Sequence, residues 1–181
     1  MHKNRIRIIL KHIMQIIAVL MLGALIIPIP VHRKYDAVEI KIDDPSYLVS
    51  CQVEIRGQYH WNILTSDMFE GQIIIPDYEL TSNRMSNVYF SDEGWPLEYY
   101  ISGSNVNGPA IGDSIFLGRF YSKPWFNQMV ITVYGENKGL EGNQGGWSTV
   151  DGYCIVPLAK NRDEAMKILL KHGLINEDKI H

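Results

Sequence analysis

The chain of 181 residues contains only two cysteines, Cys51 and Cys154, and they lie far apart in the sequence. Without a Cys-x-x-Cys spacing they cannot form a metal knuckle by themselves. In an oxidising compartment a disulfide between them is allowed, and closing so long a loop would stabilise the fold by about 3–5 kcal/mol. The alternative is a pair of reduced thiols that are buried like small hydrophobic side chains.

The sequence also lacks the short motifs that mark common catalytic and nucleotide-binding sites. It contains no GxSxG, no HExxH and no Walker loop. A nucleophile–histidine pair would have to combine Cys154 with His60, and neither residue has sequence neighbours that indicate an activated thiol. The sequence therefore assigns no catalytic residue, no cofactor and no metal site, and it favours a protein that is not an enzyme.

Acidic residues are absent from residues 1–35, which carry six of the 17 Lys and Arg residues: Lys3, Arg5, Arg7, Lys11, Arg33 and Lys34. Residues 36–181 hold the other 11 and all 20 acidic residues, a formal charge of −9. Such an acidic segment is unsuited to nucleic-acid binding, which needs clustered Lys and Arg against the phosphates. We therefore expect no nucleic-acid partner.

Residues 13–29 form the longest uncharged stretch, with Gln15 as its only polar side chain. As a helix this stretch would span about 26 Å, enough to cross a bilayer with modest adjustment. It is apolar all round, which argues against a helix lying on a membrane surface. We therefore predict a single transmembrane helix that ends near Pro28 and Pro30, with the lipid bilayer as its partner.

A cleaved signal peptide is the main alternative for this segment. No small-x-small cleavage site follows the apolar stretch, so an uncleaved anchor is favoured. Four Lys or Arg residues precede the stretch and two follow it, which places the N-terminus in the cytoplasm. The resulting prediction is a single-pass protein of the cell membrane, with residues 1–35 as cytoplasmic N-terminus and anchor and 36–181 as an extracytoplasmic domain.

From Asp36 onward the apolar residues alternate with period two, which is typical of β-strands. The clearest strand covers residues 48–56, where Val49, Cys51, Val53 and Ile55 share one face. Turn signals rich in Gly, Pro and Asp separate the strands. The predicted fold is mainly β, an antiparallel sandwich or small barrel. The other strand candidates are 37–42, 58–64, 69–75, 87–91, 97–102, 114–121, 129–134 and 153–158.

One α-helix is predicted near the C-terminus. Asn161 is a suitable N-cap, and Glu164 follows it at the spacing of a capping box. Apolar residues then recur at helical spacing until Gly173, which suits a left-handed C-cap. We expect this helix to cover one face of the sheet.

The segment 135–148 is rich in Gly and Asn and includes Glu136 and Glu141. Oxygen-rich loops of this kind bind calcium, but the alternating acidic spacing of a calcium loop is missing. A long loop is the favoured interpretation.

Three tryptophans, Trp95, Trp125 and Trp147, lie beside Gly or Pro in predicted loops. Exposed rings there are candidates for ligand contact, for instance by stacking on sugars or clamping a peptide. The alternative is that these rings fill the core or cover the sheet, as most strand aromatics do.

Two runs, RGQYHWNILTSDMFEGQIII at 56–75 and GYCIVPLAKNRDEAMKIL at 152–169, resemble uncharacterised small membrane-anchored proteins of low-GC Gram-positive bacteria. Those proteins share a short anchor, a Gly-x-Tyr strand and a C-terminal helix, and they have no assigned activity. The resemblance covers about a third of the chain. It implies the same architecture here and nothing about catalysis.

The favoured function is a membrane-anchored extracytoplasmic binding or interaction module, with another envelope protein or a cell-wall component as its partner. An envelope-acting hydrolase is the alternative. It would use carboxylates that the sequence does not pair, with Asp92, Glu93, Asp113 and Glu141 as candidates.

Overall fold

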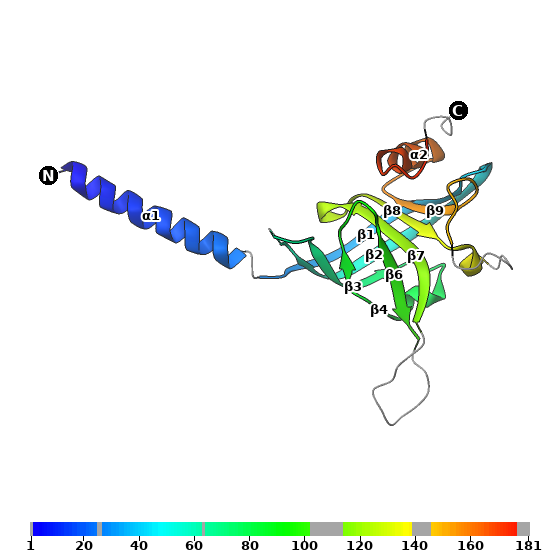
Figure 1. Ribbon diagram of the computed structural model, residues 1–181, viewed down its shortest axis with the longest axis horizontal. Coiled ribbons are helices and arrows are strands. Elements are labelled where there is room, and N and C mark those ends of the chain that lie inside the picture. The colour runs from blue at the N-terminus through cyan, green and yellow to red at the C-terminus, as the bar shows by residue number, and fades with distance from the viewer. Residues whose placement is uncertain (1, 25–26, 63, 102–113, 139–145, 177–181) are drawn as a thin grey trace, which may run out of the picture.

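The protein is described from a computed structural model that covers residues 2–24, 27–62, 64–101, 114–138 and 146–176. Within these residues a single antiparallel sheet forms the body, helix α2 covers part of its outer face, and helix α1 extends away from it (Figure 1). The elements in chain order are α1 (His2–Ala24), β1 (Ile29–Lys41), β2 (Asp44–His60), β3 (Met68–Ile74), the 3-10 helix η1 (Glu79–Ser82), β4 (Arg84–Met85), β5 (Val88–Tyr89), β6 (Trp95–Tyr100), β7 (Ser114–Lys123), η2 (Pro124–Phe126), β8 (Asn127–Val133), η3 (Gly135–Lys138), β9 (Tyr153–Pro157) and α2 (Arg162–Lys171).

The sheet has nine strands in the order β4-β6-β7-β8-β9-β1-β2-β3-β5, and every pair is antiparallel. Its two edge strands, β4 and β5, are joined by only Ser86 and Asn87, so the edges must meet and the sheet curls. The Ser86 amide donates to the Glu98 carbonyl at 2.9 Å, which extends the β4–β6 pairing to this link. The predicted mainly β, antiparallel class is confirmed, and opposite walls of the curled sheet face each other as the layers of a sandwich do.

The interior of the curled sheet is filled by apolar side chains from almost every strand. Period-two alternation directs one face of each strand inward, and burying each large side chain stabilises the fold by about 1.5–3 kcal/mol. The Tyr99 hydroxyl crosses the interior and donates to the Ile73 carbonyl at 2.7 Å, which satisfies its polar end. The largest fully buried members are Tyr59, Tyr99, Phe69, Phe126, Ile55, Ile73, Ile75, Leu97, Leu117, Met129 and Ile131.

Two glycines oppose each other where β2 and β3 pair most closely, Gly57 on β2 and Gly71 on β3. A Cβ on Gly71 would lie 2.2 Å from the Arg56 carbonyl oxygen and 2.7 Å from the Phe69 ring. A Cβ on Gly57 would lie 2.2 Å from the Glu70 carbonyl oxygen. Side chains at either position would push the two backbones apart, so the close approach requires glycine on both strands.

One carboxylate, Glu39 on β1, is buried on the inner side of the sheet with 3% exposure. Its two oxygens accept from the Tyr47 hydroxyl at 3.0 Å and the Tyr78 hydroxyl at 3.1 Å. Burial, with the nearby Glu39 carboxylate as a further cause, raises the pKa of Tyr47 to about 12 and that of Tyr78 further. Both tyrosines therefore remain protonated donors to this carboxylate at physiological pH.

Helix α2 confirms the predicted C-terminal helix. The Asn161 side chain accepts from the Glu164 amide at 2.9 Å, and the Glu164 carboxylate accepts from the Lys160 amide at 2.8 Å. Arg162 donates to the carbonyls of Lys41 and Ile42 at 2.8 and 2.7 Å, which ties the helix to the β1–β2 turn. The helix buries its apolar face against a second cluster on the outer sheet face, made by Val38, Ile40, Val130, Cys154, Val156, Ala165, Met166 and Leu169 with their neighbours.

The predicted transmembrane helix is wrong. Within the described part of the chain, no helix is both long enough and apolar enough to cross a membrane. The predicted stretch 13–29 does not form one helix, because α1 ends at Ala24 and Ile29 already pairs with Tyr59 in the sheet. The helix instead begins at His2 and takes in the basic residues that were expected to precede it. Only residues 13–24 are both helical and uncharged, about 18 Å of helix.

Candidate functional site

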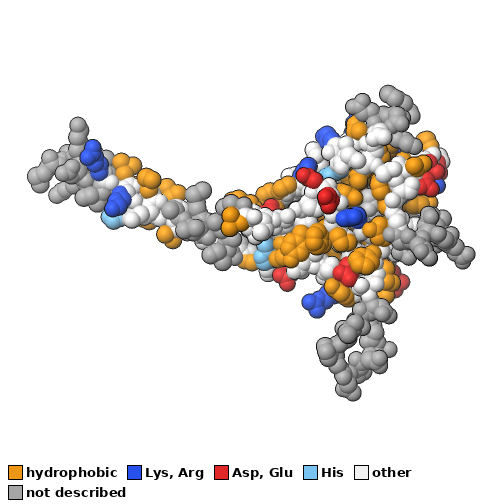
Figure 2. Space-filling view, viewed as in Figure 1, with side chains coloured by type: hydrophobic (Ala, Val, Ile, Leu, Met, Phe, Trp, Pro, Cys, Tyr) orange, Lys and Arg blue, Asp and Glu red, His pale blue; other side chains and the backbone are white. Residues whose placement is uncertain are grey.

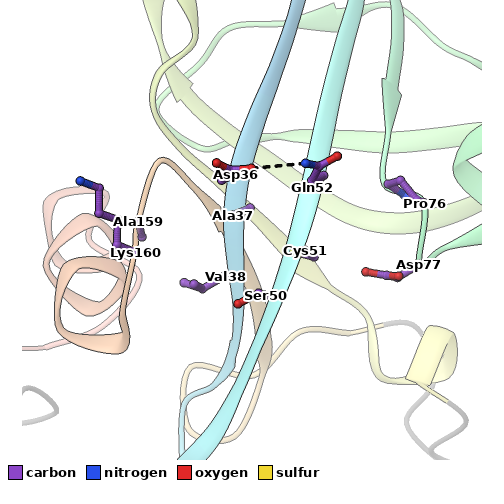
Figure 3. Close-up of a pocket in the computed structure, with 10 residues that line it drawn as sticks. All are labelled: Asp36, Ala37, Val38, Ser50, Cys51, Gln52, Pro76, Asp77, Ala159 and Lys160. Carbon is purple, nitrogen blue, oxygen red and sulfur yellow. Dashed lines mark hydrogen bonds between the residues drawn. The ribbon is translucent and has the colours of Figure 1, made fainter.

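A groove of about 520 Å³ lies along β1 and β2, between the turn that precedes α2 and the segment that follows β3. Figure 3 shows β1 and β2 side by side, with Ala159 and Lys160 on one side and Pro76 and Asp77 on the other. The complete lining is Asp36, Ala37, Val38, Ser50, Cys51, Gln52, Pro76, Asp77, Ala159 and Lys160.

Small side chains make this hollow, because Ala37, Ser50 and Ala159 leave space that larger residues would fill. The Gln52 amide donates to the Asp36 carboxylate at 3.4 Å across the two strands (Figure 3). On the α2 side, the Leu158 amide donates to the Asp36 carbonyl at 2.9 Å, and Leu158 has a positive φ of 71°. That turn sets the position of Ala159 and Lys160 beside β1.

The groove contains an open strand edge. β1 pairs with β2 along its whole length, but β3 pairs with β2 only from Glu54 to His60. Within the described residues, no strand pairs with the second edge of β2 between Asp44 and Val53. Leu48 and Val49, in this unpaired part of β2, are 46% and 42% exposed. Natural sheets usually protect such edges, so a long open one is a ready template for an added strand.

The unpaired part of β2 also explains why the residues predicted to share one face of the 48–56 strand are not equally buried. Val53 and Ile55 are fully buried as expected, whereas Cys51 is half-buried and Val49 is exposed. β3 ends at Ile74, which pairs with Glu54. Among the described strands, none therefore lies beside the part of β2 that precedes Glu54 on this edge.

Hydrogen exchange tests the open edge directly. Outward-facing amides between Leu48 and Val53 have no ladder partner among the described strands, so we expect them to exchange at least about tenfold faster than amides between Glu54 and His60. NMR-detected exchange on the full-length protein measures both sets. Equal protection of the two segments would show that the edge is covered.

A second pocket, of about 410 Å³, lies where the two sheet edges meet. The rings of Tyr89 and Trp95 lie 4.7 Å apart at 56°, and the Tyr100 hydroxyl is 3.5 Å from the Glu98 carboxylate. Of the three candidate tryptophans, Trp95 therefore lines a pocket that has both aromatic and polar walls. The lining residues are Arg84, Met85, Ser86, Asn87, Tyr89, Trp95, Pro96, Glu98 and Tyr100.

The other two tryptophans have different surroundings. Trp125 stacks on Tyr59 with ring centres 4.7 Å apart and an interplanar angle of 20°, and it remains partly exposed. Its φ of 65° lies in the left-handed region, which costs about 1–3 kcal/mol for a residue other than glycine. Trp147 is half-buried, and its Nε1 donates to the Tyr153 carbonyl at 3.0 Å. The three tryptophans therefore have no shared set of neighbours.

The two cysteines form no disulfide with each other and lie in different clusters. Cys51 lies against the interior cluster, and Cys154 is fully buried in the cluster beneath α2. Burial raises the pKa of the Cys154 thiol, which keeps it neutral and unreactive. His60 lies at the end of β2, 3.6 Å from Glu70.

The carboxylates proposed for a hydrolase are not gathered around either pocket. Asp92 forms an ion pair with Lys123 at 2.8 Å, which lowers the pKa of Asp92, and Glu93 is exposed beside it. Asp113 and Glu141 lie outside the described residues, as does most of the predicted 135–148 loop. Across the described ranges, no group of three or more His, Cys, Asp or Glu residues is placed to hold a metal ion.

The groove and its open edge are not predicted from the sequence. The available signal was a difference in length, because the predicted 48–56 strand continues over 58–64, whereas its partner covers only 69–75. Comparison with protein-family models, with curated proteins and with solved structures finds no match for this chain.

Proposed function

We propose that this protein is a binding module that receives an extended segment of a partner protein in the groove along the open edge of β2. The observation that supports this proposal is that one edge of β2, from Asp44 to Val53, has no partner strand in the described chain. An added strand gains main-chain hydrogen bonds from such an edge, and side-chain pockets beside it select the sequence. The exposed Leu48 and Val49 supply apolar contacts for that strand.

The charges around the groove favour a basic segment. Two exposed carboxylates, Asp36 and Asp77, line it against one ammonium group, Lys160. The surrounding chain from residue 36 onward has a formal charge of −9, which attracts basic partners over longer distances. The proposed ligand is therefore an extended peptide in which apolar residues alternate with Lys or Arg.

A peptide library displayed on phage and selected against the immobilised full-length protein tests this function. We expect enriched peptides with alternating apolar and basic residues and no proline in the core of the motif. Binding of a selected peptide should protect the amides of Leu48–Val53 from exchange, because they become part of a ladder. Enriched peptides that leave these amides unprotected would contradict the proposal, as would a selection without enrichment.

Two residues that line the groove, Asp77 and Lys160, provide matched variants that test the charge of the ligand. Asp77→Asn should weaken binding of a basic peptide by roughly threefold, the effect of one exposed charge pair, whereas Lys160→Gln should leave it unchanged or tighter. Isothermal titration at low and high salt measures both. Trp95→Ala, in the aromatic pocket, is the control that should not alter peptide affinity. Weaker binding with Lys160→Gln but not with Asp77→Asn would exclude a basic ligand.

A further inference from the structure

Helix α1 carries a set of large apolar side chains that the rest of the described protein does not cover. Seven residues between Ile9 and Val19 are 47–70% exposed, and the helix extends outward from the sheet (Figures 1 and 2). Monomeric proteins rarely expose a continuous apolar surface of this kind unless it binds something.

Between Arg7 and Ile17, the basic residues of α1 lie on one side of the helix and most of the exposed apolar residues on the other. Arg7, Lys11 and Gln15 recur every four residues and therefore form one stripe. At 100° per residue, Ile9, Ile13 and Ile16 lie on the opposite side. The sequence of 13–29 alone suggests an all-apolar helix, but the part of the helix from Arg7 to Ile17 has a basic stripe and a broad apolar side.

We propose that α1 lies along the surface of an anionic lipid bilayer, with its isoleucine side in the acyl chains and its basic side at the phosphates. Helices with this division of residues bind membrane interfaces through buried apolar area and attraction to anionic lipids. The uncharged helical part, about 18 Å, is well short of the roughly 30 Å hydrocarbon core. Its length therefore suits insertion into one leaflet parallel to the surface.

The charge of this segment selects lipid over a second copy of the helix. Residues 1–35 contain no acidic residue, so two copies would bring only basic side chains together. Lipid phosphates supply the complementary negative charge, and Figure 2 shows basic side chains on the outer part of the helix and apolar ones between them and the sheet. This inference is independent of the peptide groove, which lies on the sheet.

Flotation of full-length protein with vesicles tests the proposal. We expect the protein to float with vesicles of phosphatidylcholine and phosphatidylglycerol, and to float much less with phosphatidylcholine alone or at high salt. Arg7→Gln and Lys11→Gln should each lower partitioning to the anionic vesicles by about fivefold. Equal binding to both kinds of vesicle, or no binding to either, would overturn the proposal.

Adjacent residues on opposite sides of α1 provide the decisive pair of variants. Ile16→Asp puts a carboxylate on the proposed buried side and should lower partitioning at least about tenfold, whereas Gln15→Asp adds the same charge on the polar side and should lower it only a few fold. Equal loss in both variants would mean that the helix is not oriented by the surface. Unchanged near-UV circular dichroism and unchanged peptide binding verify that the sheet remains folded in each variant.

Discussion

Replacing Glu39 with alanine is expected to lower the free energy of unfolding by about 3–4 kcal/mol, because it removes the shared acceptor of two tyrosines. The carboxylate is 3% exposed and accepts from both Tyr47 and Tyr78. Its removal leaves the buried Tyr78 hydroxyl without this acceptor and opens a cavity on the inner side of β1. Urea denaturation followed by tryptophan fluorescence measures the change.

Two variants separate the hydrogen bonds from the cavity. Glu39→Gln keeps one acceptor oxygen and the side-chain volume, so it should cost less than half as much as Glu39→Ala. Tyr78→Phe in the Glu39→Ala background should cost little further, because the bond to Glu39 is already lost. Independent, additive losses in the double variant would show that the Tyr78–Glu39 bond contributes nothing to stability.

The second large effect is expected at the glycine pair of β2 and β3. Gly71→Ala should destabilise the fold by about 3 kcal/mol, since its Cβ would meet the Arg56 carbonyl at 2.2 Å and force the strands apart. Separation there also moves Phe69, which is fully buried in the interior cluster. Thermal unfolding by differential scanning calorimetry measures the loss.

The matched control is Gly23→Ala in helix α1, where no atom lies within 4 Å of the added methyl group. Alanine favours a helix interior over glycine, so this variant should leave the melting temperature of the sheet unchanged. If Gly71→Ala melted at the same temperature as Gly23→Ala, the close approach of β2 and β3 would not be required for stability.

The sequence by itself determined where most strands lie and where helix α2 begins. Alternation over 48–56 and 153–158 and the Asn161–Glu164 cap involve only near neighbours, so they can be read locally. It placed Trp95 in a loop because Gly94 and Pro96 flank it, whereas Trp95 begins strand β6.

Only the tertiary structure decided which strands pair, where each pairing stops, and how the N-terminal segment divides between helix and sheet. The groove depends on the register that pairs Glu54 with Ile74 and leaves the start of β2 open. The predicted transmembrane helix failed for a related reason, because pairing of Ile29 with Tyr59 draws the end of the apolar stretch into β1. Hydropathy depends on the residues of one segment, whereas strand pairing depends on two segments that are far apart in the chain. The local sequence pattern therefore does not show whether the end of the apolar stretch forms helix or strand.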